Sequence, residues 1–289
     1  MSFSGEVKEE LAQHFTPARH CQIAELAAIM NYCGQYGRDA EGNYTIGFQT
    51  ENEAARRKGF TLLKKTYNLD IGVSISEEQI RGLLQKVGDL HEPVSRMLIK
   101  NSCCQRAFLR GAFLSIGSMS DPQKGYHLEF VCTDEDKAKQ LQSVLVGFDI
   151  DAKIVIRKKY FVVYIKDGTG IVDLLNVCEA HVSLMKLENL RIVKEMRNSI
   201  NRRVNCETAN ISKTVNAATR QIEDILYIKE FYGFANLPGG LKEMAEVRLE
   251  NPDVPLKELG EYLDPPVGKS GVNHRLRKLS ELAERLRME

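Results

Sequence analysis

A short basic run near the C-terminus is where side-chain chemistry stands out most. Residues 265–280 contain four basic side chains and no acidic one, although the whole chain balances 40 basic against 39 acidic residues. The candidate contact residues are Lys269, Ser270, Asn273, His274, Arg275, Arg277 and Lys278. Arg and Lys bind phosphate or guanine, and Asn can pair with adenine. We therefore predict contact with double-stranded DNA; a solvated helix face is the alternative.

The elements around this run are typical of a helix-turn-helix. A short helix is predicted over 256–263, a Pro-rich turn over 264–269, and a longer helix from Ser270. The turn exceeds the usual three or four residues. The longer helix has an apolar stripe, made by Val272, Leu276, Leu279, Ala283 and Leu286. The stripe leaves Asn273, His274, Arg277 and Lys278 on the other face, near the helix start that enters a major groove.

The rest of the C-terminal part is also predicted to be helical. Residues 210–289 form the predicted helix-turn-helix domain, and residues 201–209 the predicted linker. A long basic segment, residues 181–206, precedes and overlaps this linker. We interpret it as a connecting helix with a solvated face, in preference to a binding surface.

The first two thirds of the chain contain an internal repeat. Leu26 corresponds to Leu109, 83 positions later, and Gly34 to Gly117 at the same offset. The offset falls to 81 where residues 69–75 match residues 150–156. We predict repeat units over about 21–90 and 103–180 within one domain, residues 21–200. A helix over residues 1–20, with Ser4 as its N-cap, precedes this domain.

The repeat predicts a helix, a strand, a helix and a strand in each unit. Alternating residues predict strands over 44–48 and 126–130, and Thr50 and Thr133 are predicted N-caps of the helices that follow. In the second unit, residues 152–157 and 160–166 are predicted to form a hairpin. Its Arg157, Lys158 and Lys159 are candidates for a second DNA contact, or they form an exposed turn. In the first unit, a helix from Ser76 to Val87 is predicted instead.

The repeated helices resemble the LAGLIDADG motif of homing endonucleases. The matching segments are LAAIMNYCG (26–34) and LRGAFLSIG (109–117). Small residues at 27, 28, 111 and 112 would let the two helices approach closely, and the final glycines would be left-handed helix caps. Cys33 and Ile116 stand where the nucleases keep their metal-binding acids, so no cleavage is predicted. A surviving nuclease would need other carboxylates, such as Asp121 or Asp134.

Composition limits the remaining possibilities. The chain has 289 residues, 43% of them hydrophobic, which is enough for two or three folded domains. Its seven cysteines include no CxxC pair and lack a suitable pair of histidines, so we predict reduced thiols and no metal or other cofactor. The N-terminus is no signal peptide and no segment is long enough to span a membrane. We therefore predict a cytoplasmic, nucleoid-associated protein.

The whole chain resembles the WhiA family of Gram-positive bacteria. Four segments carry the resemblance: SFSGEVKEELA, CCQRAFLRGAFLSIGSMSDP, NRRVNCETANISKTVNAA and LDPPVGKSGVNHRLRKLSELA. The resemblance implies an α+β fold in which tandem αβ units form a pseudo-twofold LAGLIDADG-like domain. An all-α helix-turn-helix domain, similar to the promoter-reading domain of sigma factors, would follow.

The resemblance also implies a non-enzymatic DNA-binding regulator tied to cell division and chromosome segregation, and to sporulation in actinomycetes. The N-terminal domain would hold DNA or another protein. A scaffold whose basic helix binds an acidic protein is the alternative function.

Overall fold

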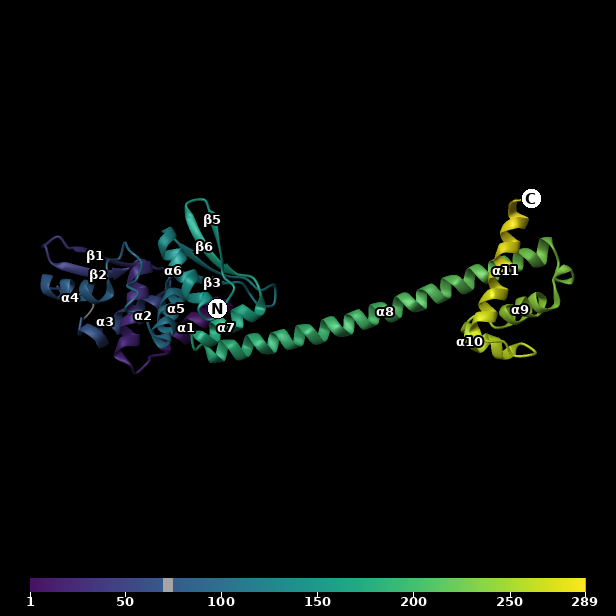
Figure 1. Cartoon of the computed structure of the whole chain (residues 1–289), viewed down its shortest axis with the longest axis horizontal. Helices are drawn as coiled ribbons and strands as arrows, with labels where there is room; N and C mark the ends of the chain where they lie inside the picture. Colours follow the sequence, from purple (N-terminus) through teal and green to yellow (C-terminus); the bar gives the residue numbers. More distant parts are fainter. Residues whose placement is uncertain (70–74, 289) are drawn as a thin grey trace. The chain divides into compact units, whose positions relative to one another are not determined.

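The chain forms two compact units joined by one long helix. The structure, a computed structural model, describes residues 1–69 and 75–288. The first unit is Met1–Lys194, and the second begins at Glu195. Helix α8 (His181–Phe231) crosses this boundary without interruption (Figure 1). The linker predicted over 201–209 lies inside α8, so the connection is helical.

The first unit contains two helix–strand repeats and flanking helices. The first repeat consists of α2 (Arg19–Cys33), β1 (Gly34–Arg38), β2 (Tyr44–Phe48), α3 (Glu53–Tyr67) and α4 (Glu77–Val87). The second consists of α5 (Ser102–Ile116), β3 (Gly117–Met119), β4 (Leu128–Cys132), α6 (Glu135–Val146), β5 (Lys153–Arg157) and β6 (Tyr160–Ile165). Helix α1 (Phe3–Gln13) precedes the repeats, and α7 (Gly168–Val177) follows them.

The strands confirm the repeat and correct two details of it. β1 pairs with β2, while the second sheet has the antiparallel order β3-β4-β6-β5. The hairpin of β5 and β6 and the helix α4 both confirm the prediction. The strand predicted over 126–130 lies two residues later, at β4, and each unit has an extra strand directly after its first helix. Residues 69–75, which the repeat matches to residues 150–156, fall largely outside the described residues.

The helix starts use other caps than those predicted. Ser2, not Ser4, caps α1, with its Oγ accepting from the Gly5 N–H at 3.2 Å. Asn52 and Asp134 cap α3 and α6, in place of Thr50 and Thr133. An Asn or Asp side chain one or two residues further on has the same acceptor chemistry and lies closer to the first free N–H groups. The sequence therefore located α3 and α6 correctly and misplaced only their N-caps. The helix predicted over residues 1–20 is shorter than predicted, because α1 ends at Gln13 and α2 begins at Arg19.

Gly111 brings α2 and α5 close together. A Cβ at Gly111 would lie 2.5 Å from the Glu25 carbonyl oxygen and 2.9 Å from the Ala28 Cβ. Real Cβ atoms do not approach backbone atoms this closely, so the position requires glycine. The steric requirement outweighs the lower helix propensity of glycine, which costs about 1 kcal/mol relative to alanine. The predicted close approach is present in the structure.

Gly34 and Gly117 have a different role from the one predicted. Both have negative φ (−74° and −78°) and extended ψ, so neither is a left-handed cap. A Cβ would lie 2.5 Å from the Met30 carbonyl oxygen at Gly34, and 2.5 Å from the Phe113 ring at Gly117. Each glycine is needed because the chain passes directly from helix into strand with no intervening loop.

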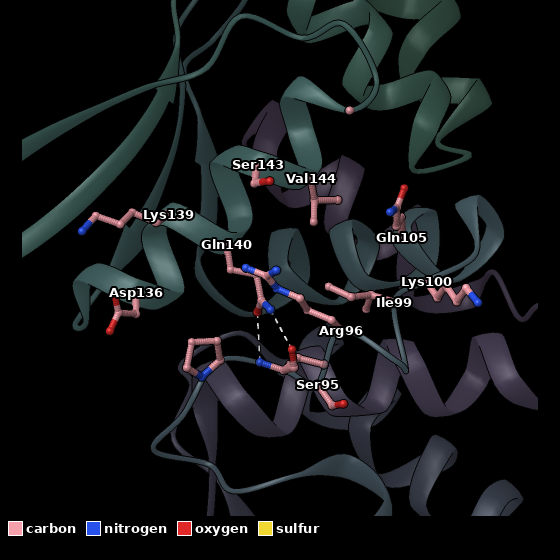
Figure 2. Close-up of a pocket in the computed structure, with 13 residues that line it drawn as sticks. Ser95, Arg96, Ile99, Lys100, Gln105, Asp136, Lys139, Gln140, Ser143 and Val144 are labelled. Atoms are coloured by element: carbon pink, nitrogen blue, oxygen red, sulfur yellow. Dashed lines mark hydrogen bonds between the residues drawn. The ribbon is translucent and has the colours of Figure 1, made fainter.

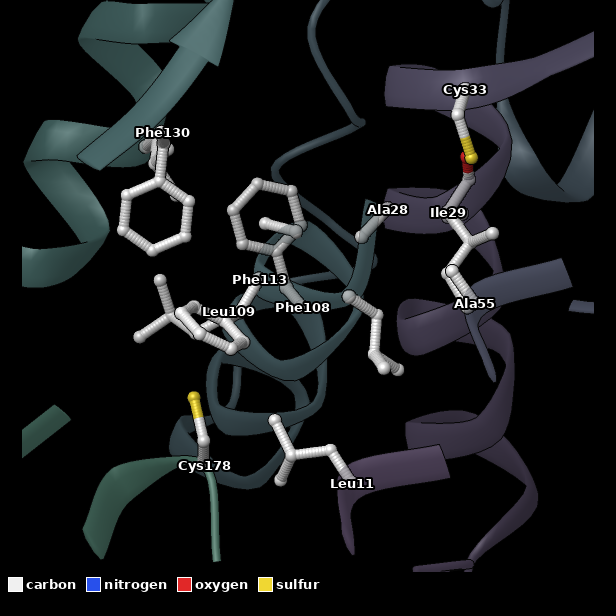
Figure 3. Packing of buried hydrophobic residues seen from close by; sticks show 14 of the residues in the cluster. Leu11, Ala28, Ile29, Cys33, Ala55, Phe108, Leu109, Phe113, Phe130 and Cys178 are labelled. Atoms are coloured by element: carbon white, nitrogen blue, oxygen red, sulfur yellow. The ribbon is translucent and has the colours of Figure 1, made fainter. Parts of the chain in front are cut away.

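The apolar core of the first unit surrounds this helix pair. Figure 3 shows Leu109 and Phe113 of α5 lying between Phe130 of β4 and Ala28 of α2. The Phe113 and Phe130 rings meet edge to face, with centroids 6.1 Å apart and planes at 82°. Such a contact stabilises beyond simple area burial. The core thus ties the second sheet to the α2–α5 pair.

A buried ionic group fixes the middle of the same pair. Glu25 of α2 is fully buried and lies 3.2 Å from Lys58 Nζ and 3.1 Å from Arg110 Nε. Arg110 also contacts Glu179 at 2.7 Å and donates to the Thr16 hydroxyl at 2.8 Å. Buried charges need such partners because desolvation of an isolated ion is very costly. The group links α2, α3 and α5 with the segments around residues 16 and 179.

The second unit has a small core of its own. Its elements after α8 are η1 (Phe234–Asn236), α9 (Gly239–Glu250), α10 (Leu256–Leu259), η2 (Gly260–Tyr262) and α11 (Lys269–Met288). Ile225 and Ile228 of α8 and Met244 of α9 belong to one buried cluster with the stripe of α11. This cluster fixes the position of α11.

Candidate nucleic-acid interface

Helix α11 presents the predicted contact residues on one exposed face. Val272, Leu276, Leu279 and Ala283 are buried, as the apolar stripe predicts, and Leu286 packs partly against them. Six of the seven candidates are exposed: Lys269, Ser270, Asn273, His274, Arg277 and Lys278. The helix begins at Lys269, one residue earlier than predicted. Its free N–H groups are therefore next to two of the candidates.

Arg275 lies apart from this face. Its guanidinium is half-buried, donates to the Gly240 carbonyl at 3.3 Å and lies 3.6 Å from Glu243 of α9. Glu243 also accepts a hydrogen bond of 2.7 Å from the backbone N–H of Asp264 in the turn. Arg275 and Glu243 thus hold α9, the turn and α11 together. Sequence reasoning did not identify Glu243, because its partners are far away in the chain.

A close backbone contact shapes the turn before α11. The Val267 N–H donates to the Gly260 carbonyl at 2.9 Å. A Cβ at Gly260 would lie 1.9 Å from the Val267 carbonyl oxygen, so only glycine fits there. This contact folds the long turn over 264–269 back onto α10 and sets where α11 starts. The residues predicted as a helix over 256–263 form the short α10 followed by η2.

A groove runs between α11 and the second-unit part of α8. It has a volume of about 510 Å³ and is lined by Lys213, Asn216, Arg220 and Gln221 of α8 and by Asn273, Arg277 and Ser280 of α11, among others. Lys213 and Arg220 of α8 place two exposed cations beside the exposed face of α11, and Asp224 and Glu284 also line the groove. Arg277 contacts Glu281 at 2.9 Å across one turn of the helix. The sequence did not reveal the two α8 cations, because only folding brings them beside α11.

The hairpin candidates belong to the first unit. Arg157, Lys158 and Lys159 are all exposed where β5 turns into β6. Arg157 contacts Glu129 of β4 at 2.7 Å, which partly neutralises it. Lys158 has a φ of +55°, and Lys159 lies 5.4 Å from the centre of the Tyr160 ring. The two lysines remain available for an anionic partner.

Cys33 and Ile116 lie at the C-terminal ends of α2 and α5 and supply no carboxylate. The Cys33 thiol is buried and donates to the Ile29 carbonyl at 3.3 Å, and burial raises its pKa. Ile116 has no ligand atom. The Lys8 ammonium lies near enough to Cys33 to influence its pKa, while burial lowers the pKa of Lys8 itself to about 8. A neutral thiol beside an ammonium group disfavours a divalent cation.

The alternative carboxylates are used for backbone capping. Asp134 accepts from the N–H groups of Asp136 and Lys137 at 2.9 and 3.0 Å. Asp121 accepts from the Gln123 N–H at 2.9 Å. Within residues 1–69 and 75–288, neither belongs to a group of three or more possible metal ligands.

A separate polar groove lies in the first unit. It has a volume of about 860 Å³ and is lined by residues 93–100 and by α6 (Figure 2). Gln140 holds its wall by accepting from the Val94 N–H at 2.9 Å and donating to the Val94 carbonyl at 2.6 Å. Its charged lining residues are Arg96, Lys100, Lys139 and Asp136. The groove contains none of the predicted contact residues and only one carboxylate.

The fold and the comparisons together define the class of protein. The first unit has a LAGLIDADG-like fold and the second contains a helix-turn-helix. Residues 19–81 match the WhiA N-terminal LAGLIDADG-like domain, residues 105–197 the WhiA LAGLIDADG-like domain, and residues 200–283 the WhiA C-terminal HTH domain. The chain belongs to the WhiA family.

Relatives match over nearly the whole length. A protein of Lachnoclostridium phytofermentans named "Probable cell division protein WhiA" is 51% identical, covering 99% of this chain and 100% of its own. A protein of the same name from Alkaliphilus oremlandii is 48% identical, covering 99% and 98%. The crystal structure of full-length WhiA from Thermatoga maritima has a TM-score of 0.61 at 28% identity and covers 99% of both chains. In the described part, no helix is long and apolar enough to cross a membrane.

Proposed function

We propose that this chain binds double-stranded DNA through the exposed face of α11 and does not cleave it. The observation that carries the proposal is the division of α11 into a buried apolar stripe and an exposed face with Asn273, Arg277 and Lys278. Lys213 and Arg220 add two cations across the groove, which Asp224 and Glu284 also line, and Asp224 is paired with Arg287 at 2.8 Å. A face of this kind combines phosphate binding with side chains that can read base edges.

We further propose a regulatory role in cell division, with transcription and chromosome segregation as the processes it affects in the nucleoid. The names of the relatives support the link to cell division. Cys33 and Ile116 support the absence of catalysis, because a thiol and an alkyl group stand where the LAGLIDADG nucleases keep carboxylates, and the Lys8 ammonium interacts with Cys33. The hairpin lysines, Lys158 and Lys159, would add a weaker contact with DNA phosphates.

The test is DNA affinity of the full chain as a function of salt. Log affinity should fall linearly with log salt, with a slope of about −0.9 for each phosphate contact. Arg277→Ala should cost about 1–3 kcal/mol, roughly 5- to 150-fold in affinity, if Arg277 contacts a base. Arg285→Ala removes the same charge two turns later on α11 and is the matched control.

Equal affinities of the two variants would contradict the proposed recognition face. An affinity for DNA that does not depend on salt would instead favour the scaffold function, in which the basic helix binds an acidic protein. Cleavage of DNA that requires magnesium and is lost in Asp121→Asn or Asp134→Asn would revive the nuclease alternative.

A further inference from the structure

Four possible metal ligands meet at the N-terminal ends of α2 and α5. They are His20 and Cys21 of α2 and Cys103 and Cys104 of α5, and their ligand atoms all lie within 4.8 Å of one another. His20 Nδ1 is 3.2 Å from Cys104 Sγ and 3.4 Å from Cys21 Sγ. No other group of three or more such ligands occurs among the residues that the structure describes.

The spacing of these atoms fits a tetrahedral zinc ion. Zinc binds thiolate sulfur at about 2.3 Å and imidazole nitrogen at about 2.0 Å, so neighbouring ligand atoms lie roughly 3.5–3.8 Å apart. The two N···S distances are slightly shorter and the other separations are at most 4.8 Å, so binding would need side-chain movements of about 1 Å or less. Three cysteines and one histidine form a closed structural set, because all four positions are filled by protein.

The four residues of the cluster differ in their exposure. Cys21 and Cys104 are buried beside Ala24 and Ala107, whereas His20 and Cys103 are exposed and leave a path for entry. A zinc ion would stabilise the thiolate form of the buried sulfur atoms, because it binds the thiolates and releases their protons.

The cluster lies where the repeat symmetry brings equivalent positions together. His20 and Cys103 are 83 positions apart, as are Cys21 and Cys104, the same offset that relates Leu26 to Leu109. Each helix therefore contributes two adjacent residues, and the helices already pack closely at Gly111. Neither N-cap residue, Ala18 or Asn101, makes a side-chain capping bond, so both positive helix ends are available to stabilise thiolates.

We propose that His20, Cys21, Cys103 and Cys104 bind one zinc ion that holds the two repeat units together. The ion connects the starts of α2 and α5 across the axis of the repeat, independently of any contact with DNA. Its role is structural, since the four protein ligands leave no position for water or substrate.

The first experiment measures zinc in the full-length protein, purified under reducing conditions and then supplied with zinc chloride and desalted. About one zinc per chain is expected, with a tetrahedral thiolate spectrum when cobalt replaces zinc. Wild-type protein that retains no zinc would overturn the proposal, as would iron in place of zinc or a disulfide between two of the cluster's cysteines.

The second experiment compares two exposed cysteines. Cys103→Ser should lower zinc affinity at least tenfold and abolish the fall in melting temperature that a chelator causes in the wild type. Cys206→Ser, which removes an exposed thiol of α8 outside the cluster, should change neither. Equal zinc affinity in the two variants would overturn the assignment. His20→Ala, at an exposed ligand, provides the same comparison should Cys103→Ser not fold.

Discussion

The two ends of the α2–α5 pair carry opposite chemistry on the same symmetric frame. At the N-terminal end, equivalent positions of the repeat bring together three thiols and an imidazole. At the C-terminal end, the equivalent positions are Cys33 and Ile116, with the Lys8 ammonium beside the thiol. Either end of the α2–α5 pair can bring equivalent positions of the two repeats together. The residue types at those positions decide which end can bind a metal ion.

Among these predictions, Glu25→Gln in the middle of the pair should have the largest effect on stability. The substitution leaves Lys58 and Arg110 buried without a full counter-charge. We expect a loss of about 3–5 kcal/mol in the free energy of unfolding. Urea unfolding, followed by hydrogen exchange of the α2 and α5 amides, measures it. Glu77→Gln, at an exposed pair with Arg81, should cost at most about 0.5 kcal/mol; similar losses in both variants would contradict the role of burial.

Gly111→Ala tests the close approach itself. The new Cβ meets the Glu25 backbone, so we expect a loss of about 1–3 kcal/mol despite the better helix propensity of alanine. Gly82→Ala in α4 is the matched control, because a Cβ there has nothing within 4 Å and should stabilise by about 0.5–1 kcal/mol. The same unfolding measurement serves both. A stabilised Gly111→Ala variant would show that the helices are less tightly packed than described.

Lys8→Met removes the cation from the C-terminal end. Burial lowers the pKa of Lys8 to about 8, so between pH 8 and its ordinary value of 10.5 the unfolded chain binds more protons than the folded chain. Stability of the wild type should therefore rise through this pH range. The variant should lack this rise and gain about 1 kcal/mol at pH 7, because no ammonium has to be desolvated. An identical pH dependence of unfolding in both proteins would contradict the assignment.

Aspartates at positions 33 and 116 should have the smallest effect of these changes, since we expect them to confer no DNA cleavage. In Cys33→Asp combined with Ile116→Asp, the Lys8 ammonium remains close to the new carboxylate at position 33, so we expect no DNA cleavage with magnesium. Circular dichroism first establishes that the variant is folded, and a plasmid-nicking assay then measures cleavage. Magnesium-dependent nicking would show that the lost acids alone separate this domain from a nuclease.

Local sequence patterns predicted most of the fold. The apolar stripe of α11 and the hairpin of β5 and β6 depend on neighbours a few residues apart, which a sequence displays directly. The observed N-cap residues differ from the predicted ones by one or two positions, because several nearby side chains could accept the same hydrogen bonds. The sequence indicated that each helix ends at a glycine, Gly34 or Gly117. It did not give their backbone conformation, which depends on a strand that starts immediately after the helix.

The sequence by itself determined the 83-residue repeat and the basic face of α11, and the resemblance to the LAGLIDADG motif aligned Cys33 and Ile116 with the nuclease acids. These follow from residue identity and short-range periodicity. Only the tertiary structure placed Lys213 and Arg220 beside α11, tied Arg275 to α9 and gathered His20 and Cys21 with Cys103 and Cys104. Residues that are distant in the chain meet only once α2 packs on α5 and α8 packs on α11. The spacing of cysteines within one segment therefore could not predict a group of metal ligands that two repeat units share.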